Sequence, residues 1–367
     1  MTGTADVLVI GGGMAGISAG ARLAEAGLSV RVLEREAAIG QHSTGRSAAM
    51  YIPSYGNATL RALIAAGAEV MLAPRALARG TLTSPRGMML VASEAELPDF
   101  EATLAEPNGM ERITPEEARA WVPVLRPEAV AAAARDPAAM AIDVDLMLQG
   151  FARALRAAGG QVVSGAEVRG LTRRGGDWLI ETAAGAFAAP VVVNAAGAWA
   201  DMVAGLAGLS PLGLQPMRRT AAILPAPKDH DIENWPLVAS AAEAWYFKPE
   251  AGKLLVSPAE EDPVEPMDAW PDDMVLAEGL WRFEQAVSVP VTRVERSWAG
   301  LRTFAPDRTP VAGFDPRAEG FFWLAGQGGN GIQAAPGLAG LAAGLIAGQA
   351  LGLAPEVVAA VSPARFA

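Results

Sequence analysis

The sequence predicts a mixed α/β fold in which a mostly parallel, discontinuous sheet is combined with a second, mostly antiparallel layer. Three observations support this fold class. Residues 5–34 show the order strand, glycine turn, helix and strand, which is a βαβ unit. Residues 321–326 form another apolar strand that runs into a glycine-rich turn and an apolar helix. Residues 213–302 are rich in short strand patterns, as expected for the second layer.

Apolar periodicity and turn residues place the remaining elements in chain order. The segment that begins at Thr114 has the Thr-x-x-Glu pattern of a helix cap, so a helix is expected to follow it. A polar loop is expected at Ser43–Ser47, just beyond the second strand. Further helices are expected over about 58–72, 94–105 and 271–286 and from Asp143 onward, and strands over 87–92, 161–164, 166–173, 177–182 and 186–193.

The order of these elements predicts two domains. The first and last βα segments would share one sheet, so the first domain is expected to comprise 1–82, 141–212 and 303–367. The second domain is then expected to comprise 83–140 and 213–302. A chain of 367 residues is long enough for two such domains.

Composition excludes several classes of function. The net charge of −11 gives no electrostatic footprint for nucleic acid or anionic lipid. The sequence contains no cysteine and only two histidines, His42 and His230. Disulfides, thiolate or multi-histidine metal sites and cysteine nucleophiles are therefore excluded. What remains favoured is chemistry that an organic cofactor carries for the protein.

Neither end of the chain predicts a membrane anchor. Residues 1–6 carry no basic region, so we expect no signal peptide and a cytoplasmic location. The apolar segment Ala334–Ala360 is interrupted by Gln349, Glu356 and two prolines. A buried helix packed tightly against a sheet through its glycines explains this segment better than a membrane span.

A dinucleotide-binding turn lies in the first βαβ unit. Gly11, Gly13 and Gly16 fit G-x-G-x-x-G between a strand and a helix, which is a Rossmann-like context. The helix N-terminus would supply N–H groups to a pyrophosphate. Glu34 ends the second strand, where its carboxylate can accept hydrogen bonds from ribose hydroxyls and would repel a 2′-phosphate. This pattern argues against NADP but does not separate FAD from NAD.

Three further segments favour FAD. The loop Ser43-Thr44-Gly45-Arg46-Ser47 supplies hydrogen-bonding groups for a cofactor that extends past its pyrophosphate. The strand that ends in Asn194-Ala195-Ala196-Gly197 finishes in small residues, as a close approach requires. Gly328–Gln333 opens the last helix, whose N-terminus would stabilise negative charge on a reduced flavin.

These motifs resemble the D-amino acid oxidase superfamily of flavoproteins over nearly the whole chain, and most closely its bacterial D-arginine dehydrogenase-like branch. The motifs are Glu34-Arg35-Glu36, HSTGRSAA at 42–49, Tyr55-Gly56, NAAGAWAD at 194–201, LGLQPMRR at 212–219, SWAGLR at 297–302 and GQGGNGIQ at 326–333. The resemblance implies noncovalent FAD and oxidation of a C–N bond by hydride transfer to flavin N5. The imino acid product then hydrolyses to a 2-oxo acid and ammonia. The cofactor-binding residues that we expect are Gly11, Gly13, Met14, Ala15, Gly16, Glu34, Arg35, Ser43, Thr44, Gly45, Arg46, Ser47, Ala48, Val168, Gly197, Gly329, Asn330, Gly331, Ile332 and Gln333.

A carboxylate-binding site follows from the same resemblance and from the chemistry of arginine. An arginine fork suits the carboxylate of an amino acid better than a lysine does. Arg219 and Arg302 match the family positions, and Arg218 would point to the opposite face of its strand. Tyr246 matches a tyrosine that binds the substrate carboxylate, and Tyr55 one on a mobile loop over the site. Gly300 and Gln333 match positions beside the substrate and flavin, and no side chain stands out as a catalytic base.

Three departures from the D-arginine enzymes concern the pocket for the substrate side chain. Met88 stands where a glutamate would pair with a basic substrate, Met50 replaces a histidine and Ile52 replaces a threonine. A cation buried against methionine would lack a partner. We therefore expect neutral, mostly apolar D-amino acids to be preferred over D-Arg, provided that no nearby acid such as Glu243 takes the place of the missing carboxylate.

Several alternatives stay open on the sequence. The same fold could act on an N-alkyl glycine, a cyclic imino acid or a 2-hydroxy acid, or serve as a non-catalytic flavoprotein subunit. The glycine motif is also compatible with a nicotinamide-dependent dehydrogenase. The partners expected are a small-molecule substrate and an electron acceptor, either oxygen or a quinone-type compound, with no nucleic acid, no metal and no membrane span.

Overall fold

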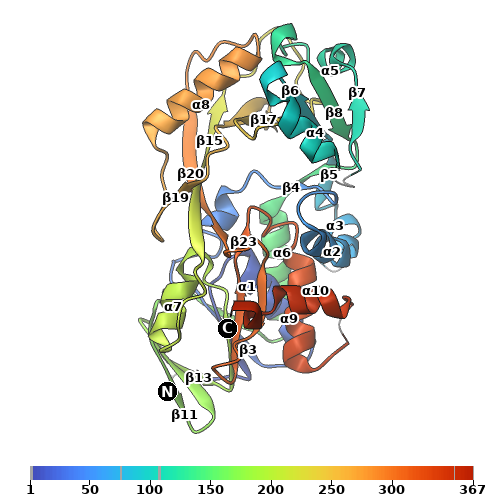
Figure 1. The fold of residues 1–367 in the computed structure, drawn as a ribbon. Helices are drawn as coiled ribbons and strands as arrows, with labels where there is room; N and C mark the ends of the chain where they lie inside the picture. The colour runs from blue at the N-terminus through green and yellow to red at the C-terminus, as the bar shows by residue number, and fades with distance from the viewer. Residues whose placement is uncertain (1–2, 75–76, 106–108, 351, 367) are drawn as a thin grey trace.

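The protein is described by a computed structural model that covers residues 3–74, 77–105, 109–350 and 352–366. Residues 1–2, in the segment tested for a signal peptide, and 351, in the apolar C-terminal segment, lie outside this description. The chain forms an elongated molecule with two lobes, and both of its ends lie in the same lobe (Figure 1).

The lobe that holds both chain ends is built on a six-stranded sheet of order β10-β3-β2-β14-β22-β21. All neighbouring strands are parallel except β21 and β22. The strands are β2 (Val7–Ile10), β3 (Val30–Leu33), β10 (Gln161–Val163), β14 (Val191–Asn194), β21 (Val311–Phe314) and β22 (Phe321–Ala325).

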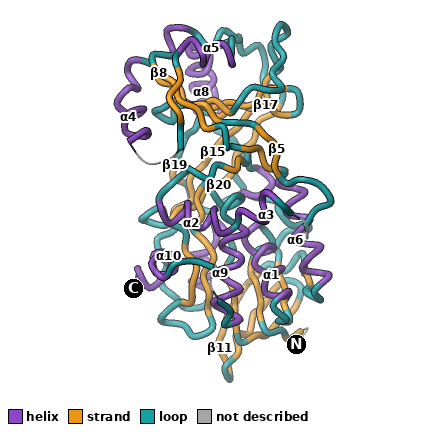
Figure 2. The backbone as a smooth tube through the Cα atoms, turned by 90° about the vertical axis from the view of Figure 1, so that its right-hand side faces the viewer, coloured by secondary structure: helices purple, strands orange, loops and turns teal. Residues whose placement is uncertain are grey.

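Alternate side chains of this sheet enter two different cores. Val9, Val32 and Phe322 pack on one face against helices α1 (Met14–Glu25), α6 (Val144–Ala157) and α9 (Ala335–Ala347). Figure 2 shows these helices in front of the strands. Leu8 and Trp323 pack on the other face against a four-stranded sheet of order β1-β13-β12-β11 and against helix α7. The bounds are β1 (Gly3–Thr4), β11 (Val168–Arg174), β12 (Asp177–Thr182), β13 (Gly185–Ala189), η4 (Gly197–Trp199) and α7 (Ala200–Leu206).

The second lobe is built on a long, mostly antiparallel sheet of order β23-β20-β15-β18-β17-β16-β6-β8-β7, with β19 also paired to β15. Only β16 and β6 run parallel in this sheet. The strands are β6 (Met88–Ala92), β7 (Glu111–Ile113), β8 (Ala132–Asp136), β15 (Gln215–Leu224), β16 (Leu237–Ser240), β17 (Tyr246–Glu250), β18 (Lys253–Ser257), β19 (Asp262–Pro263), β20 (Arg296–Phe304) and β23 (Gln327–Gly328).

Helix α8 (Asp273–Ala286) covers one face of this second sheet. Its Leu280 and Phe283 pack against Val91 and Phe247 of the strands. The opposite face carries Met88 and Tyr246 and looks toward the first lobe. The remaining elements are η2 (Glu94–Glu96), α4 (Leu97–Ala105), α5 (Pro115–Trp121), η3 (Pro127–Ala129) and a small sheet of β4 (Met50–Tyr51), β9 (Met140–Ile142) and β5 (Thr83–Pro85) between the lobes.

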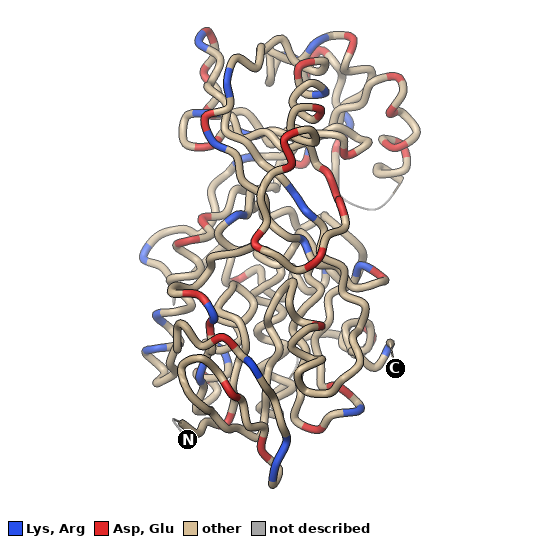
Figure 3. Tube along the Cα trace, turned by 90° about the vertical axis from the view of Figure 1, so that its left-hand side faces the viewer, with Lys and Arg blue, Asp and Glu red and all other residues tan. Residues whose placement is uncertain are grey.

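The mixed α/β fold class and the antiparallel second layer are confirmed. We propose two domains with the boundaries given above, each built on one large sheet; β23 (Gln327–Gly328), from the first domain, extends the second sheet. No helix in the described part of the chain is long and apolar enough to cross a membrane. Acidic and basic residues are interspersed over both lobes (Figure 3).

Four local predictions need correction. The helix expected over 58–72 is two helices, α2 (Ala58–Ala66) and α3 (Ala68–Leu72), which meet at Gly67; glycine ends helices readily, and Gly67 packs against Pro336 and Gly337. The strand expected over 186–193 is β13 and β14 in different sheets, separated by Pro190, which lacks the N–H that a continuous ladder needs. The loop expected at Ser43–Ser47 contains a 3₁₀ helix, η1 (Ser43–Arg46).

The apolar C-terminal segment is the fourth correction. It is divided into α9 and α10 (Pro355–Val361), followed by η5 (Pro363–Phe366). Its tightest glycine contact is with a helix and not with the sheet, since a Cβ on Gly337 would lie 2.0 Å from the carbonyl oxygen of Leu63 in α2. A Cβ on Gly340 would meet nothing within 4 Å.

Candidate active site

A continuous cavity of about 1230 Å³ runs from the glycine turn of the first lobe to the inner face of the second sheet. Its walls come from segments that are far apart in sequence. These are the β2–α1 turn, η1, the end of β14, strands β15, β17 and β20, and the turn before α9. One cavity therefore joins the predicted cofactor residues to the predicted substrate residues.

The glycine turn is closed too tightly for larger residues. Gly11 has a φ of 109°, and a Cβ there would lie 2.4 Å from the carbonyl oxygen of Ala195. A Cβ on Gly16 would lie 1.9 Å from the carbonyl oxygen of Gly11. Helix α1 begins at Met14 with no side-chain cap from Gly13, so its N-terminus is presented to the cavity. This geometry suits a pyrophosphate at the helix N-terminus.

Glu34 braces the turn from the neighbouring strand. Its Oε2 accepts a hydrogen bond of 2.6 Å from the N–H of Gly12, and its Oε1 accepts one of 2.8 Å from the N–H of Glu36. The side chain is buried and lines the cavity. Each carboxylate oxygen keeps a second lone pair, so Glu34 can hold the turn and still accept a ribose hydroxyl.

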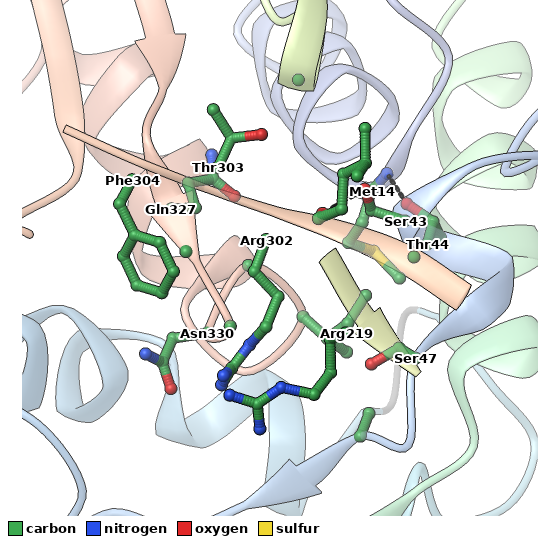
Figure 4. A pocket seen from close by; sticks show the side chains of 18 of the residues that line it. Met14, Ser43, Thr44, Ser47, Arg219, Arg302, Thr303, Phe304, Gln327 and Asn330 are labelled. Carbon is green, nitrogen blue, oxygen red and sulfur yellow. Dashed lines mark hydrogen bonds between the residues drawn. The ribbon is translucent and has the colours of Figure 1, made fainter. Parts of the chain in front are cut away.

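The η1 segment joins the two lobes beside the cavity. Thr44 Oγ1 accepts a hydrogen bond of 3.0 Å from the N–H of Met14, shown dashed in Figure 4. Ser43 Oγ donates to the carbonyl oxygen of Leu301 over 2.6 Å. The guanidinium of Arg46 is occupied by Asp268 and by the carbonyl oxygens of residues 269 and 299, so its side chain is committed to protein contacts.

The turn before α9 holds a buried glutamine at the junction of both parts of the cavity. Gln333 accepts a hydrogen bond of 2.8 Å from the N–H of Ile52 and donates one of 2.9 Å to Asn330 Oδ1. A Cβ on Gly329 would lie 1.8 Å from Nη2 of Arg302, so a larger residue here would displace the Arg302 guanidinium. The turn thus fits directly beneath one of the predicted substrate arginines.

Arg219 and Arg302 come together as predicted. Arg219 on β15 pairs with Gly300 on β20, and Arg302 lies two residues farther along the same face. Figure 4 shows their guanidinium groups side by side. Arg218, in contrast, does not line the cavity and pairs with Asp262 over 2.9 Å.

Arg219 and Arg302 share an anionic partner within the protein, the carboxylate of Glu261. Glu261 Oε1 accepts hydrogen bonds of 3.3 Å from Arg219 and 3.1 Å from Arg302. Arg308 donates to both oxygens of the same carboxylate, over 3.1 and 2.8 Å. Burial lowers the pKa of Arg219, and the nearby charge of Arg302 lowers it further.

Tyr55 and Tyr246 both line the cavity near this cluster. Burial raises the pKa of the Tyr55 phenol, and the negative charge of Glu243 raises it further. The Tyr55 hydroxyl is therefore protonated at neutral pH and available as a hydrogen-bond donor.

The three residues predicted to line the side-chain pocket also meet. Met50, Ile52 and Met88 belong to one apolar cluster that includes Leu237 and Tyr246. The cluster has an acidic neighbour that the sequence did not reveal: Asp136 pairs with Met88 across β8 and β6 and is 3% exposed. Its carboxylate accepts hydrogen bonds from Ser54 Oγ over 2.7 Å and from the N–H of Ala138 over 2.8 Å.

Most of the predicted residues line the cavity. Gly16 and Gly45 are the two that do not. Both lie behind the residues that line the cavity, where each packs closely against the backbone of another glycine. The cavity brings together Gly11, Gly13, Met14, Ala15, Glu34, Arg35, Ser43, Thr44, Arg46, Ser47, Ala48, Met50, Ile52, Tyr55, Met88, Val168, Gly197, Arg219, Tyr246, Gly300, Arg302, Gly329, Asn330, Gly331, Ile332 and Gln333.

Sequence reasoning did not find Glu261, Arg308 or Asp136. Glu261 lies in an irregular segment after β18 and Arg308 follows a turn, so no periodic pattern marks either residue. Asp136 could have been found only by pairing β8 with β6, a contact between segments that the sequence does not align.

The family comparison agrees with this geometry. The glycine cradle, the helix N-terminus and the long cavity fit a dinucleotide that extends to a second, reactive group. A profile of the FAD-dependent oxidoreductase family, DAO, matches residues 6–345. The chain belongs to the DAO family of FAD-dependent oxidoreductases.

Relatives in this DAO family include enzymes with different named substrates. Glycine oxidase of Geobacillus kaustophilus is 27% identical over 358 residues, which cover 92% of this chain and 91% of that protein. Its crystal structure superposes with a TM-score of 0.83 at 25% identity, covering 96% of each chain. Mouse mitochondrial sarcosine dehydrogenase is 25% identical over 346 residues, which cover 87% of this chain but only 37% of that protein.

Solved structures at lower identity show the same fold. L-proline dehydrogenase from P. horikoshii superposes with a TM-score of 0.85 at 23% identity, covering 100% of this chain and 98% of the other. FAD is thus the cofactor of this DAO-family enzyme. The closer resemblance to D-arginine dehydrogenases stays a prediction.

The attachment of FAD is testable by denaturation. No cysteine is available as a tether, and His42 already contacts Glu36 over 2.9 Å and packs on Trp199. Acid or heat should therefore release intact FAD into the supernatant, as seen by chromatography of the soluble fraction. Yellow colour that stays with the precipitated chain would contradict noncovalent binding and point to His42.

Proposed function

We propose that the enzyme oxidises the Cα–N bond of D-amino acids that have neutral, mostly apolar side chains. The product would be an imino acid, which water converts to a 2-oxo acid and ammonia. The observation that carries this proposal is the position of Arg219 and Arg302 on one face of neighbouring strands at the far end of the FAD cavity, beside Tyr246 and an apolar wall.

Each part of the substrate has a matching group in the cavity. Two guanidinium groups suit a carboxylate, and the hydroxyls of Tyr55 and Tyr246 line the same space. Methionine walls adapt to several side-chain shapes, which favours apolar substituents at Cα. Alkyl groups gain about 0.8 kcal/mol for each CH₂ that they bury.

Bound FAD supplies a hydride acceptor at flavin N5. The residues of this chain are proposed to hold Cα in reach of that acceptor, to keep the carboxylate in place and to exclude water. No side chain needs to remove a proton from carbon when the substrate enters as the neutral amine, because the nitrogen lone pair assists loss of hydride. Positioning is then the main contribution of the protein.

The prediction of side-chain preference depends on the acids around Met88. Because Met88 provides no charge, D-Leu and D-Met should exceed D-Arg in kcat/KM, by roughly 30-fold or more if a desolvated ion pair is missing. Steady-state kinetics with these three substrates measure the difference. Asp136 accepts hydrogen bonds from Ser54 and Ala138 but keeps further lone pairs, so it is the buried acid beside Met88 that can oppose this preference.

A preference for D-Arg would be explained by Asp136, the buried acid beside Met88. If D-Arg is preferred about tenfold or more, Asp136 serves as the acid for the substrate cation, and Asp136→Asn should then remove the preference. Glu243→Gln is the matched variant, because Glu243 is a second acid that lines the cavity.

A second candidate substrate class is an N-alkyl glycine or a cyclic imino acid. It is favoured by the relatives, which are named for glycine, sarcosine and proline. Sarcosine and both enantiomers of proline in the same panel distinguish this class, since these substrates make little use of the pocket around Met88. Assays with oxygen and with a quinone acceptor identify the oxidant.

A further inference from the structure

The carboxylate of Glu261 lies where the proposed substrate carboxylate should bind. Its Oε1 accepts hydrogen bonds from Arg219 and Arg302, the two arginines assigned to the substrate. Its Oε2 contacts Arg308 alone, over 2.8 Å. Oε1 therefore lies between the guanidinium groups of Arg219 and Arg302, while Oε2 is bound by Arg308.

The backbone that carries Glu261 is fixed in place. Ser257 Oγ donates to the carbonyl oxygen of Thr220 over 2.6 Å and accepts from the N–H of Ala259 over 3.1 Å. Ala259 has a φ of 56°, which is a strained conformation for a residue with a Cβ. Nε of Arg219 also donates to the carbonyl oxygen of Glu260 over 2.7 Å. Movement at this site is therefore expected in the Glu261 side chain and not in its backbone.

The arginine pair requires an anion when no substrate is present. Two partly buried guanidinium groups repel each other, and the loss of hydration increases this cost. The adjacent Glu260 does not supply this anion. Neither of its carboxylate oxygens accepts a hydrogen bond, and burial raises its pKa. Glu261 supplies the required negative charge through its ion pairs with Arg219 and Arg302.

We propose that Glu261 is a resident placeholder for the substrate carboxylate, which leaves Arg219 and Arg302 when a carboxylate ligand binds and is retained by Arg308. This proposal rests on the proposed function for the identity of the natural ligand. Arg308 is suited to retention because it contacts both carboxylate oxygens and stacks on Phe304, with its guanidinium carbon 3.8 Å from the ring centroid. Glu261 is thus a positioning residue that sets carboxylate affinity by competition.

The test compares carboxylate binding to the FAD-loaded enzyme and its variants. Propanoate is the probe, because it has a carboxylate but no amine to oxidise, and a shift in the flavin spectrum reports its binding. Glu261→Gln keeps an oxygen that accepts from the arginines but removes the competing charge. Its dissociation constant for propanoate should be about five- to tenfold lower than that of the unmodified enzyme.

Asp262→Asn is the matched control. It makes the same change in charge one residue away, where Asp262 pairs with Arg218 outside the cavity. Its propanoate affinity should stay within about twofold of the unmodified enzyme. Equal affinities in Glu261→Gln and Asp262→Asn, or weaker binding in Glu261→Gln, would overturn the proposal.

A second pair of variants tests the retention step. Arg308→Gln should weaken propanoate binding by about threefold or more, because Glu261 then stays on the arginine pair. In the Glu261→Gln background the same change should have a smaller effect, as a double-mutant cycle requires for coupled residues. Additive effects in this cycle would overturn the assignment of Arg308.

Failure of the placeholder and failure of the proposed function give different results. If Glu261→Gln binds propanoate more tightly but no amino acid reduces the flavin, the placeholder stands and the proposed substrate is wrong. If D-amino acids reduce the flavin but Glu261→Gln gains no affinity, the proposed function stands and the placeholder is wrong.

Discussion

Replacing Arg302 with methionine is expected to lower kcat/KM by roughly 30-fold to several thousand-fold, or about 2–5 kcal/mol, because one half of the carboxylate clamp is removed. Methionine keeps much of the volume of the side chain but none of its hydrogen bonds. The loss should also be large because Arg219 would remain paired with Glu261, which no longer shares its carboxylate with Arg302. Steady-state kinetics with D-Met or D-Leu measure the effect.

The control for this variant is Arg218→Met. Arg218 precedes Arg219 on the same strand but lies outside the cavity and pairs with Asp262 and Asp272. Its activity should change by less than about fivefold. FAD content should be unchanged in both variants. Nearly normal kcat/KM in Arg302→Met, with a full complement of FAD, would remove Arg302 from the substrate site.

Replacing Gly16 with alanine is expected to abolish FAD retention during purification, with affinity for FAD reduced about 100-fold or more. The added Cβ would lie 1.9 Å from the carbonyl oxygen of Gly11 and 3.2 Å from Cγ1 of Val9. Since these contacts involve backbone and a core side chain, helix α1 would have to move away from the turn. The N-terminus of α1 would then be displaced from the pyrophosphate.

The control for Gly16→Ala is Gly340→Ala in α9. A Cβ at Gly340 meets nothing within 4 Å, and alanine is the better helix former. This control should bind FAD normally and unfold at the same or a slightly higher temperature. The flavin-to-protein absorbance ratio and calorimetry give both quantities. Normal FAD content in Gly16→Ala would show that the turn tolerates the extra carbon, contrary to the close approach described here.

Local patterns predicted those features that are defined by neighbouring residues. The glycine spacing between β2 and α1 and, in the second lobe, the Thr114 cap of α5 are each set within a few residues of the chain. The helix break at Gly67 was not predicted, although glycine is a common residue at a helix end; Gly67 also packs closely against Gly337, which lies far away in sequence. Pro190 was a local signal for separating β13 from β14, and it was overlooked.

The candidate site likewise contains residues that the sequence could identify and residues that it could not. Arg219 and Arg302 could be selected from family motifs, and alternation along one strand separated Arg219 from Arg218. Glu261 and Asp136 could not be selected, because each matters only through a partner on another strand or loop. Strand pairing over long sequence distances sets such contacts, and no periodic pattern within one segment records it.

The central claim is that this DAO-family enzyme oxidises amino acids at Cα, and one measurement tests it most directly. The purified, FAD-loaded protein is mixed without oxygen with a panel of D- and L-amino acids, glycine, sarcosine and proline, while the visible absorbance of the oxidised flavin is followed. D-Leu and D-Met should bleach the flavin rapidly and their L-enantiomers little or not at all, with formation of the matching 2-oxo acid and ammonia. Flavin that stays oxidised with every member of the panel would contradict the account.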